Sequence, residues 1–460
     1  MLNQFLKSRI ASAKKLVKEL QKDYDYVSVL GTVVNNKIIT VSTHIHSIDD
    51  VDAECGFVIK VYKNGHYSEY SCNDIEGLKA SEVRKAIRLD KAVSDDYQVK
   101  MLQENEHVQD YLREDSSSLP DKEIMKILEE TKNELHATDE RVINVVSRYT
   151  KRQTSNIFVS AKKCLTQKYD WINVILLTVV RDGSNIKSNY EAEGEADSLT
   201  ALYKFREHAP AVLDIAVRML KAKPVKPGKY TIITDPSISG LIAHEAFGHG
   251  VEMDMFVKNR AKAVDYIGEY VASPIVNMYD GAAGCLSAAS YFFDDDGVEA
   301  HRTHIIKDGI LQTGISDSLS AMELGTEPTG NGRRESYQRK VYTRMTNTYF
   351  ATGKDRYEDM IKSVKKGYLL CQTNNGMEDP KNWQIQCTAS YGLEIRNGEF
   401  TGKMIAPVVI SGYVIDLLKS ISMVSDELTV HGSGMCGKGH KEWVYVADGG
   451  PYLKAEAKLG

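Results

Sequence analysis

The chain has 460 residues, of which 42% are hydrophobic and 26% are charged. This composition is that of a folded protein, and it excludes collagen-like, low-complexity and intrinsically disordered chains. The formal net charge of −5 argues against a nucleic-acid-binding protein, and no apolar run reaches the roughly 18 residues of a membrane-spanning helix.

The first 220 residues alternate predicted helices with predicted strands. Apolar residues recur at helical spacing over 1–20, 74–89, 121–137 and 199–221. Runs rich in β-branched and aromatic residues predict strands at 26–34, 37–43, 55–62, 65–71, 141–149, 155–162, 170–181 and 186–192. The pairs Asn35-Asn36 and Asn64-Gly65 predict hairpin turns, and the polar segment 95–120 predicts a long loop.

A connector with two prolines and a glycine among lysines occupies residues 221–228. We therefore place a domain boundary between 1–223 and 224–460. The predicted fold class is α+β, with an N-terminal mixed α/β domain followed by a β-rich C-terminal domain. The chain has seven cysteines and no CxxC pair. This pattern is not a disulfide framework, and a reducing cytoplasm is the expected location.

The chemical motif lies in the β-rich part, where His244, Glu245 and His249 form the pattern His-Glu-x-x-x-His. The familiar zinc-protease pattern spaces its histidines four apart, on one face of a helix. Five residues of a regular α-helix turn about 500°, which leaves the two imidazoles about 140° out of alignment. A π-type turn would align them, and Gly248 and Gly250 would tolerate it. The motif therefore predicts that the helix widens or breaks between the histidines.

The two histidines and the glutamate suit hydrolytic chemistry. Zn²⁺ binds neutral imidazoles and, in catalytic sites, keeps one position open for water. Glu245 directly follows a candidate ligand, so its carboxylate is suited to take a proton from that water and to pass it to a leaving amine. In the alternative interpretation, His244 and His249 pack or cap helix ends and Glu245 is solvated. The spacing alone leaves both interpretations open.

A catalytic zinc site needs a third protein ligand. The candidates in the sequence are Glu252, Asp254, His301, His304, His431, Cys436 and His440. Cys436 stands in the glycine-rich segment 432–439, and a thiolate is a good soft ligand for zinc. A small hydrophobic residue on a turn is the alternative interpretation of Cys436. The adjacent Arg333 and Arg334 could line the substrate channel or help to hold an oxyanion, but a structural turn with arginine–carboxylate pairs is favoured over direct catalysis.

Seven ordered motifs between residues 229 and 438 resemble the TldD/PmbA family, metallopeptidases once called modulators of DNA gyrase. The motifs are residues 235–252, 294–297, 308–311, 328–336, 344–348, 421–424 and 435–438. The resemblance implies a cytoplasmic zinc peptidase that acts on unfolded or extended peptides. TldD-like members of the family carry the zinc motif and PmbA-like members lack it, so this chain resembles the catalytic type.

The resemblance also implies roles for single residues. His244, His249 and Cys436 match the zinc ligands of the family, and Glu245 matches its catalytic acid/base. The expected cofactor is therefore Zn²⁺. Because family members pair as dimers that enclose the active site, we expect a homodimer or a heterodimer with a PmbA-like chain. Neither nucleic acid nor membrane is an expected partner.

The chain departs from the family pattern at two places. The Val-Gly-Gln-Pro run usual after the cysteine motif is absent, and residues 282–286 replace an expected Arg-Gly-Ser stretch. These departures motivate an alternative function, a non-catalytic subunit that binds peptides or stabilises a partner. A third hypothesis, modulation of DNA topology, receives no support from the net charge of −5.

Overall fold

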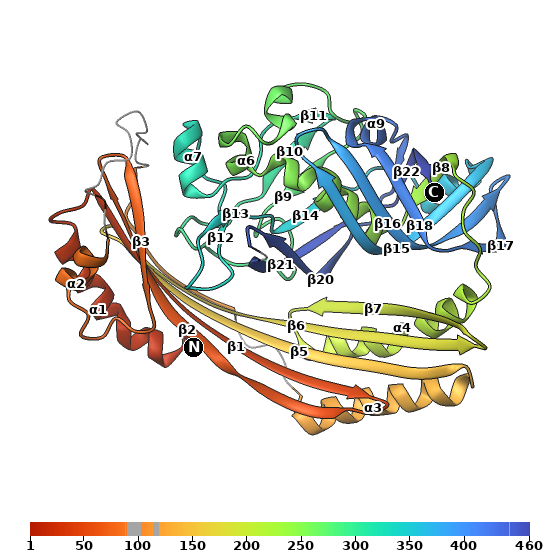
Figure 1. The fold of residues 1–460 in the computed structure, drawn as a ribbon, viewed down its shortest axis with the longest axis horizontal. Helices are drawn as coiled ribbons and strands as arrows, with labels where there is room; N and C mark the ends of the chain where they lie inside the picture. The colour runs from red at the N-terminus through yellow and green to blue at the C-terminus, as the bar shows by residue number, and fades with distance from the viewer. Residues whose placement is uncertain (88, 90–102, 114–118, 441) are drawn as a thin grey trace.

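A computed structural model of the protein describes residues 1–87, 89, 103–113, 119–440 and 442–460. Its fold class is α+β, as predicted, with a helix-covered N-terminal sheet and a β-rich C-terminal part (Figure 1). Much of the loop predicted at 95–120 lies outside the described residues. Within that range the prediction missed a strand, β4 (His107–Leu112).

The N-terminal sheet consists of long, mostly antiparallel strands. Its order is β3-β2-β1-β5-β6-β4, and β7 also pairs with β6. The strands besides β4 are β1 (Tyr26–Ser42), β2 (His46–Lys63), β3 (His66–Cys72), β5 (Val142–Val159), β6 (Lys163–Asp182) and β7 (Asn185–Glu195). Four helices accompany this sheet, namely α1 (Gln4–Leu20), α2 (Ala80–Ala86), α3 (Asp121–Thr138) and α4 (Ser198–Met219).

Two predicted breaks in this sheet are wrong. The expected turn at Asn35-Asn36 lies inside β1, where the pairing with β2 shifts register between Val34 and Asn36. The gap expected at 150–154 lies inside β5. Both segments pair with strands on two sides, and this pairing of backbone groups overrides the local turn preference. The turn at Asn64-Gly65 is confirmed, with φ of 51° and 79°.

The predicted N-terminal helices are confirmed except for the length of one. The helix expected at 74–89 is limited to α2, because Gly77 adopts a φ of 72° that no α-helix accommodates. Helices α3 and α4 lie along one face of the sheet (Figure 1). Their apolar sides pack with sheet residues in one buried cluster, to which Leu128 and Phe205 belong. This packing leaves the opposite face of the sheet for the C-terminal part.

The C-terminal part is β-rich, as predicted. Its larger sheets have the orders β15-β8-β22-β18-β16-β17 and β11-β10-β9-β14-β21-β20. The strands are β8 (Gly228–Thr234), β9 (Met278–Asp280), β10 (Thr303–Lys307), β11 (Ile310–Leu311), β12 (Gly332–Arg333), β13 (Tyr342–Thr343), β14 (Asn347–Phe350), β15 (Lys366–Asp379), β16 (Gln384–Arg396), β17 (Glu399–Ile405), β18 (Val408–Tyr413), β19 (Met423–Val424), β20 (Thr429–Lys438), β21 (Glu442–Gly450) and β22 (Leu453–Leu459).

Short helical segments connect these strands. They are α5 (Pro236–Leu241), the π-helix η1 (Ile242–Gly248), the 3₁₀ turns η2 (His249–Val251) and η3 (Lys262–Tyr266), α6 (Met253–Val257), α7 (Ser318–Leu324), α8 (Tyr357–Lys362) and α9 (Val414–Lys419). Ala243, Ala246 and Phe247 of η1 are buried in the main C-terminal core. This burial fixes the segment that carries the His-Glu-x-x-x-His motif. None of the described helices is long and apolar enough to cross a membrane.

The C-terminal part lies over the face of the N-terminal sheet that α3 and α4 leave open (Figure 1). The predicted domain boundary at residue 223 falls in the connector between α4 and β8. At the contact, Trp171 Nε1 donates to the carbonyl of Gly432 at 3.1 Å. Buried ion pairs join Lys60 of β2 to Asp296, and Glu69 of β3 to Arg334 at 3.1 Å. Leu30, Phe158 and Leu165 of the N-terminal sheet also pack with Phe293, so the two parts are joined by charged contacts and by apolar packing.

We predict that Lys60→Met destabilises the protein, because it leaves the buried Asp296 without its cation. Removal of one partner of a buried ion pair costs about 3–5 kcal/mol. Chemical denaturation should show a loss of this size in the free energy of unfolding. The control Lys63→Met, at an exposed position on the same strand, should leave it nearly unchanged. A stable Lys60→Met protein would contradict this account of the domain contact.

Candidate metal centre

The helix that carries the histidine motif is widened, as its spacing predicts. Residues 242–248 form a π-helix, and it brings the rings of His244 and His249 to a centroid separation of 5.3 Å. Gly248 permits this conformation, since a Cβ there would lie 2.2 Å from Met345 Sδ and 2.9 Å from the carbonyl oxygen of Ala243. The five-residue spacing therefore places both imidazoles on one side of the helix.

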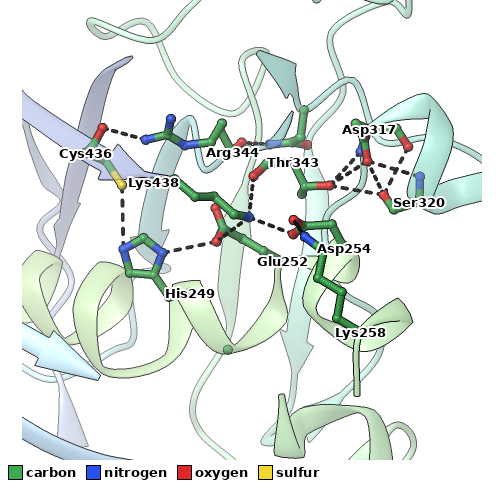
Figure 2. Close-up of polar contacts among 12 residues, drawn as sticks. His249, Glu252, Asp254, Lys258, Asp317, Ser320, Thr343, Arg344, Cys436 and Lys438 are labelled. Atoms are coloured by element: carbon green, nitrogen blue, oxygen red, sulfur yellow. Dashed lines mark hydrogen bonds and ion pairs between the residues drawn. The ribbon is translucent and has the colours of Figure 1, made fainter. Parts of the chain in front are cut away.

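Cys436 joins the two histidines from strand β20, near the other end of the chain. Its Sγ lies 3.6 Å from His249 Nε2 (Figure 2). One ligand atom from each of the three side chains lies within 4.8 Å of the others, and the described residues contain no other group of this kind. Tetrahedral zinc with ordinary Zn–N and Zn–S bonds separates a nitrogen ligand from a sulfur ligand by roughly 3.6 Å.

Burial and charge prepare these side chains for a cation. His244 and Cys436 are buried, and Nδ1 of His244 has no hydrogen-bond partner. Burial of Cys436 opposes ionisation, but the two histidines outweigh it and lower the pKa of the thiol to about 4. Two imidazoles and a thiolate are a donor set that zinc prefers. The residues of this site therefore fit a zinc ion.

Glu245 lies beside this group. Its Oε2 is 3.9 Å from His249 Nε2. Burial raises the pKa of Glu245, although His244 and His249 act in the opposite direction. Gly376 of β15 packs directly against it, since a Cβ there would lie 2.8 Å from both Cβ and Cγ of Glu245. The sheet thus restricts where this carboxylate can lie.

A network of buried charged side chains contacts the Nδ1 side of His249, opposite the side that faces Cys436 (Figure 2). Glu252 Oε2 lies 3.2 Å from His249 Nδ1, and Lys438 Nζ donates to the same oxygen at 3.0 Å. Lys438 also contacts Asp254 Oδ1 at 2.7 Å. Burial would raise the pKa of Glu252, but Lys438 and His249 lower it to about 2. A carboxylate on Nδ1 fixes the ring and directs Nε2 toward the metal position.

Two arginines brace the backbone around Cys436. The buried Arg344 donates to the carbonyl oxygens of Cys436 and, at 3.2 Å, Glu442 (Figure 2). Arg333 donates to the carbonyl oxygens of Met345 and Tyr445, each at 2.7 Å. Arg334 forms the expected arginine–carboxylate pair, with Glu69 at 3.1 Å, but the expected turn is wrong at Arg333, which lies in strand β12.

The other candidate ligands lie outside the three-residue group. Glu252 and Asp254 contact Lys438, and His304 Nε2 lies 2.9 Å from Asn277 Oδ1. His431 lines a cavity between the N-terminal sheet and the C-terminal part. The sequence reasoning missed the supporting roles of Lys438 and Arg344. One signal was available for Lys438, because it stands two residues after Cys436 on a strand and so faces the same side.

Residues 227–457 match the family model described as the PmbA/TldA metallopeptidase C-terminal domain. The chain belongs to the TldD/PmbA family. A metalloprotease of Methanothermobacter thermautotrophicus is 29% identical over 321 residues, which cover 69% of this chain and 70% of that protein. A Saccharolobus solfataricus protein named zinc metalloprotease TldD homolog is 30% identical over 241 residues, which cover 52% and 53%.

A solved structure gives the same picture of the fold. The TM0727 protein of Thermotoga maritima superposes with a TM-score of 0.79 over 98% of this chain and 99% of that chain, at 19% sequence identity. The N-terminal half, which lies outside the quoted motifs, therefore shares the fold of that protein as well. The histidine and cysteine motifs of this family member lie within the matched residues 227–457.

We predict that Glu252→Gln weakens zinc binding, because a neutral amide cannot hold the His249 ring as a carboxylate does. The expected loss of zinc affinity is about 10- to 100-fold. Competition with a chromophoric chelator measures it. The control Glu269→Gln removes a charge from an exposed position and should bind zinc as the wild type does. Equal zinc affinity in Glu252→Gln would show that Glu252 does not orient the ligand.

Proposed function

We propose that this family member is a zinc-dependent metallopeptidase that hydrolyses unfolded or extended peptides. The observation that carries the proposal is the meeting of His244, His249 and Cys436 at a π-helical turn, with Glu245 beside them. Bound by these three side chains, zinc would act as a Lewis acid and would lower the pKa of a water molecule toward about 7.

The proposed role of Glu245 is that of general base and then general acid. Its carboxylate flanks the metal position, so it can accept a proton from water and return it to the amine that leaves. Packing against Gly376 keeps the group oriented. Glu252 contacts the ring of His249, and Lys438 in turn donates to Glu252.

An extended peptide has a suitable edge at the site. Strand β20, which carries Cys436, is the last strand of its six-stranded sheet. Two cavities adjoin this strand just before Cys436, one lined by Met435 and the other by Gly434. Main-chain pairing with such an edge binds peptides with low sequence selectivity. This arrangement supports unfolded peptides as the substrate class.

The proposal extends to assembly and location. We propose a dimer, formed either by two copies of this chain or with a PmbA-like chain, and a cytoplasmic location. The seven cysteines are free thiols in the structure, which agrees with a reducing compartment. Nucleic acid and membrane are not proposed as partners.

We predict that the purified protein contains about one zinc ion per chain and that His244→Ala lacks it. The loss of a buried ligand leaves two donors, too few for a stable catalytic zinc site. Elemental analysis after exhaustive dialysis measures the content. The control His304→Ala removes a histidine outside the group and should retain zinc. Full zinc content in His244→Ala would refute the ligand assignment.

Glu245→Gln should keep zinc and lose peptide hydrolysis by about 10²- to 10⁴-fold, because only the proton acceptor is removed. The rate of cleavage of an unfolded peptide measures the loss. The control Glu358→Gln, at an exposed position, should cleave normally. Full cleavage by Glu245→Gln would exclude Glu245 as the base. If the zinc-loaded wild type cleaves no unfolded peptide, the alternative of a non-catalytic peptide-binding subunit replaces the proposal.

A further inference from the structure

Strand β15 contacts both helical segments of the histidine motif, η1 and η2. Two of its residues, Gly376 and Glu378, stand two apart on the strand and so face the same side. Gly376 packs against Glu245, and Glu378 lies beside Gly250, the residue that directly follows His249. One face of this strand therefore touches the motif both before and after its second histidine.

The contact of Glu378 is a hydrogen bond to the backbone. The amide of Gly250 donates to Glu378 Oε2 at 3.0 Å. In a π-helix each amide donates to the carbonyl five residues earlier, as the amide of His249 does to that of His244. One more wide turn would direct the amide of Gly250 to the carbonyl of Glu245. The carboxylate of Glu378 takes this amide instead, and the 3₁₀ turn η2 follows.

Gly250 allows the carboxylate to approach the backbone this closely. The residue is buried, and a Cβ there would lie 2.5 Å from Glu378 Oε1 and 3.4 Å from Trp383 Nε1. A side chain at this position would therefore displace the carboxylate. A buried amide that loses its acceptor costs about 1–3 kcal/mol. The hydrogen bond thus depends on a glycine on one side and on an acceptor on the other.

An irregularity in β15 determines the direction of Glu378. The pairing of β15 with β16 shifts register between Thr373 and Asn375, just before Gly376. A shift of one residue in a strand moves every later side chain to the opposite face. Without the shift, the exposed Met377 would face the helix in place of its two neighbours. The irregularity therefore directs a glycine and a carboxylate to the histidine motif, as β-bulges do near functional sites.

We propose that Glu378 is a positioning residue of the metal centre. By accepting the amide of Gly250, it ends the widened turn at the second histidine and fixes the imidazole of His249 relative to that of His244. It touches neither metal nor substrate and acts through the backbone. This inference rests on the zinc site of the proposed function. It differs from the role of Glu252, which contacts the ring of His249.

Replacing Glu378 with a residue that accepts no hydrogen bond from an amide tests the inference. Glu378→Met keeps a long side chain but removes the acceptor, so His249 loses its fixed position and zinc affinity should fall about 10- to 100-fold. Glu378→Gln keeps a carbonyl oxygen for the amide of Gly250 and should stay within about 3-fold of the wild type. Competition with a chromophoric chelator measures both affinities.

Absorption spectra of the Co²⁺-loaded proteins separate a positioning role from a general effect on stability. The visible bands of bound Co²⁺ are stronger in four-coordinate than in six-coordinate sites, so they report the ligand geometry. Glu378→Met should weaken or shift these bands, and Glu378→Gln should keep the wild-type spectrum. The control Glu399→Met, at an exposed position in the same seven-stranded sheet, should keep both the spectrum and the zinc affinity.

Gly250→Ala removes the same hydrogen bond from its other side. The added Cβ displaces the carboxylate, so zinc affinity should fall by a factor similar to that in Glu378→Met. The two losses should not add in the double variant, because each removes the same interaction. If Glu378→Met does not fold, Gly250→Ala and Glu378→Gln decide the question, and wild-type zinc affinity in Gly250→Ala contradicts the inference.

Three results would overturn the positioning role of Glu378. They are wild-type binding of zinc and Co²⁺ by Glu378→Met, an equal loss of affinity in Glu378→Gln, and a change confined to the free energy of unfolding. None of them touches the zinc content or the role of Glu245, so the proposed function would stand. If the wild type binds zinc but cleaves no peptide, the positioning role stands and the hydrolytic function falls. A wild type that binds no zinc overturns both.

Discussion

The candidate metal centre depends on one departure from regular helix geometry. In an α-helix, residues five apart point in different directions, so His244 and His249 would face different surroundings. The π-helical turn removes this mismatch, and it exists because Gly248 allows Met345 to pack against the backbone and because the turn is buried in the C-terminal core. The same burial that stabilises the fold therefore creates the ligand geometry.

Buried charged side chains also stabilise this geometry. Lys438 stands on the strand of Cys436 and pairs with Glu252, which in turn contacts the ring of His249. One ion pair thus connects the two segments that bring the ligands together. Arg344 holds the carbonyl of Cys436, so the thiolate and its backbone are fixed by separate contacts. A buried charge of this kind stabilises the site only while all its partners are present.

Much of this structure is predictable from local pattern. The amphipathic helices α1, α3 and α4 follow from apolar spacing, and the π-turn follows from the separation of two histidines that must meet. Local pattern fails where pairing partners decide the outcome, as at Asn35-Asn36, which tertiary pairing keeps within a strand. The spacing could not choose Cys436 among the candidate ligands, because contact between distant segments depends on sheet topology.

The late position of Cys436 has a consequence for synthesis of the protein in the cell. The two histidines emerge from the ribosome well before the cysteine, which contacts His249 from strand β20, a strand that pairs with β21. A partly made chain therefore has an incomplete ligand set. The ligand set is therefore completed only after the segment that contains Cys436 has been made, well after the π-helical turn that carries the histidines.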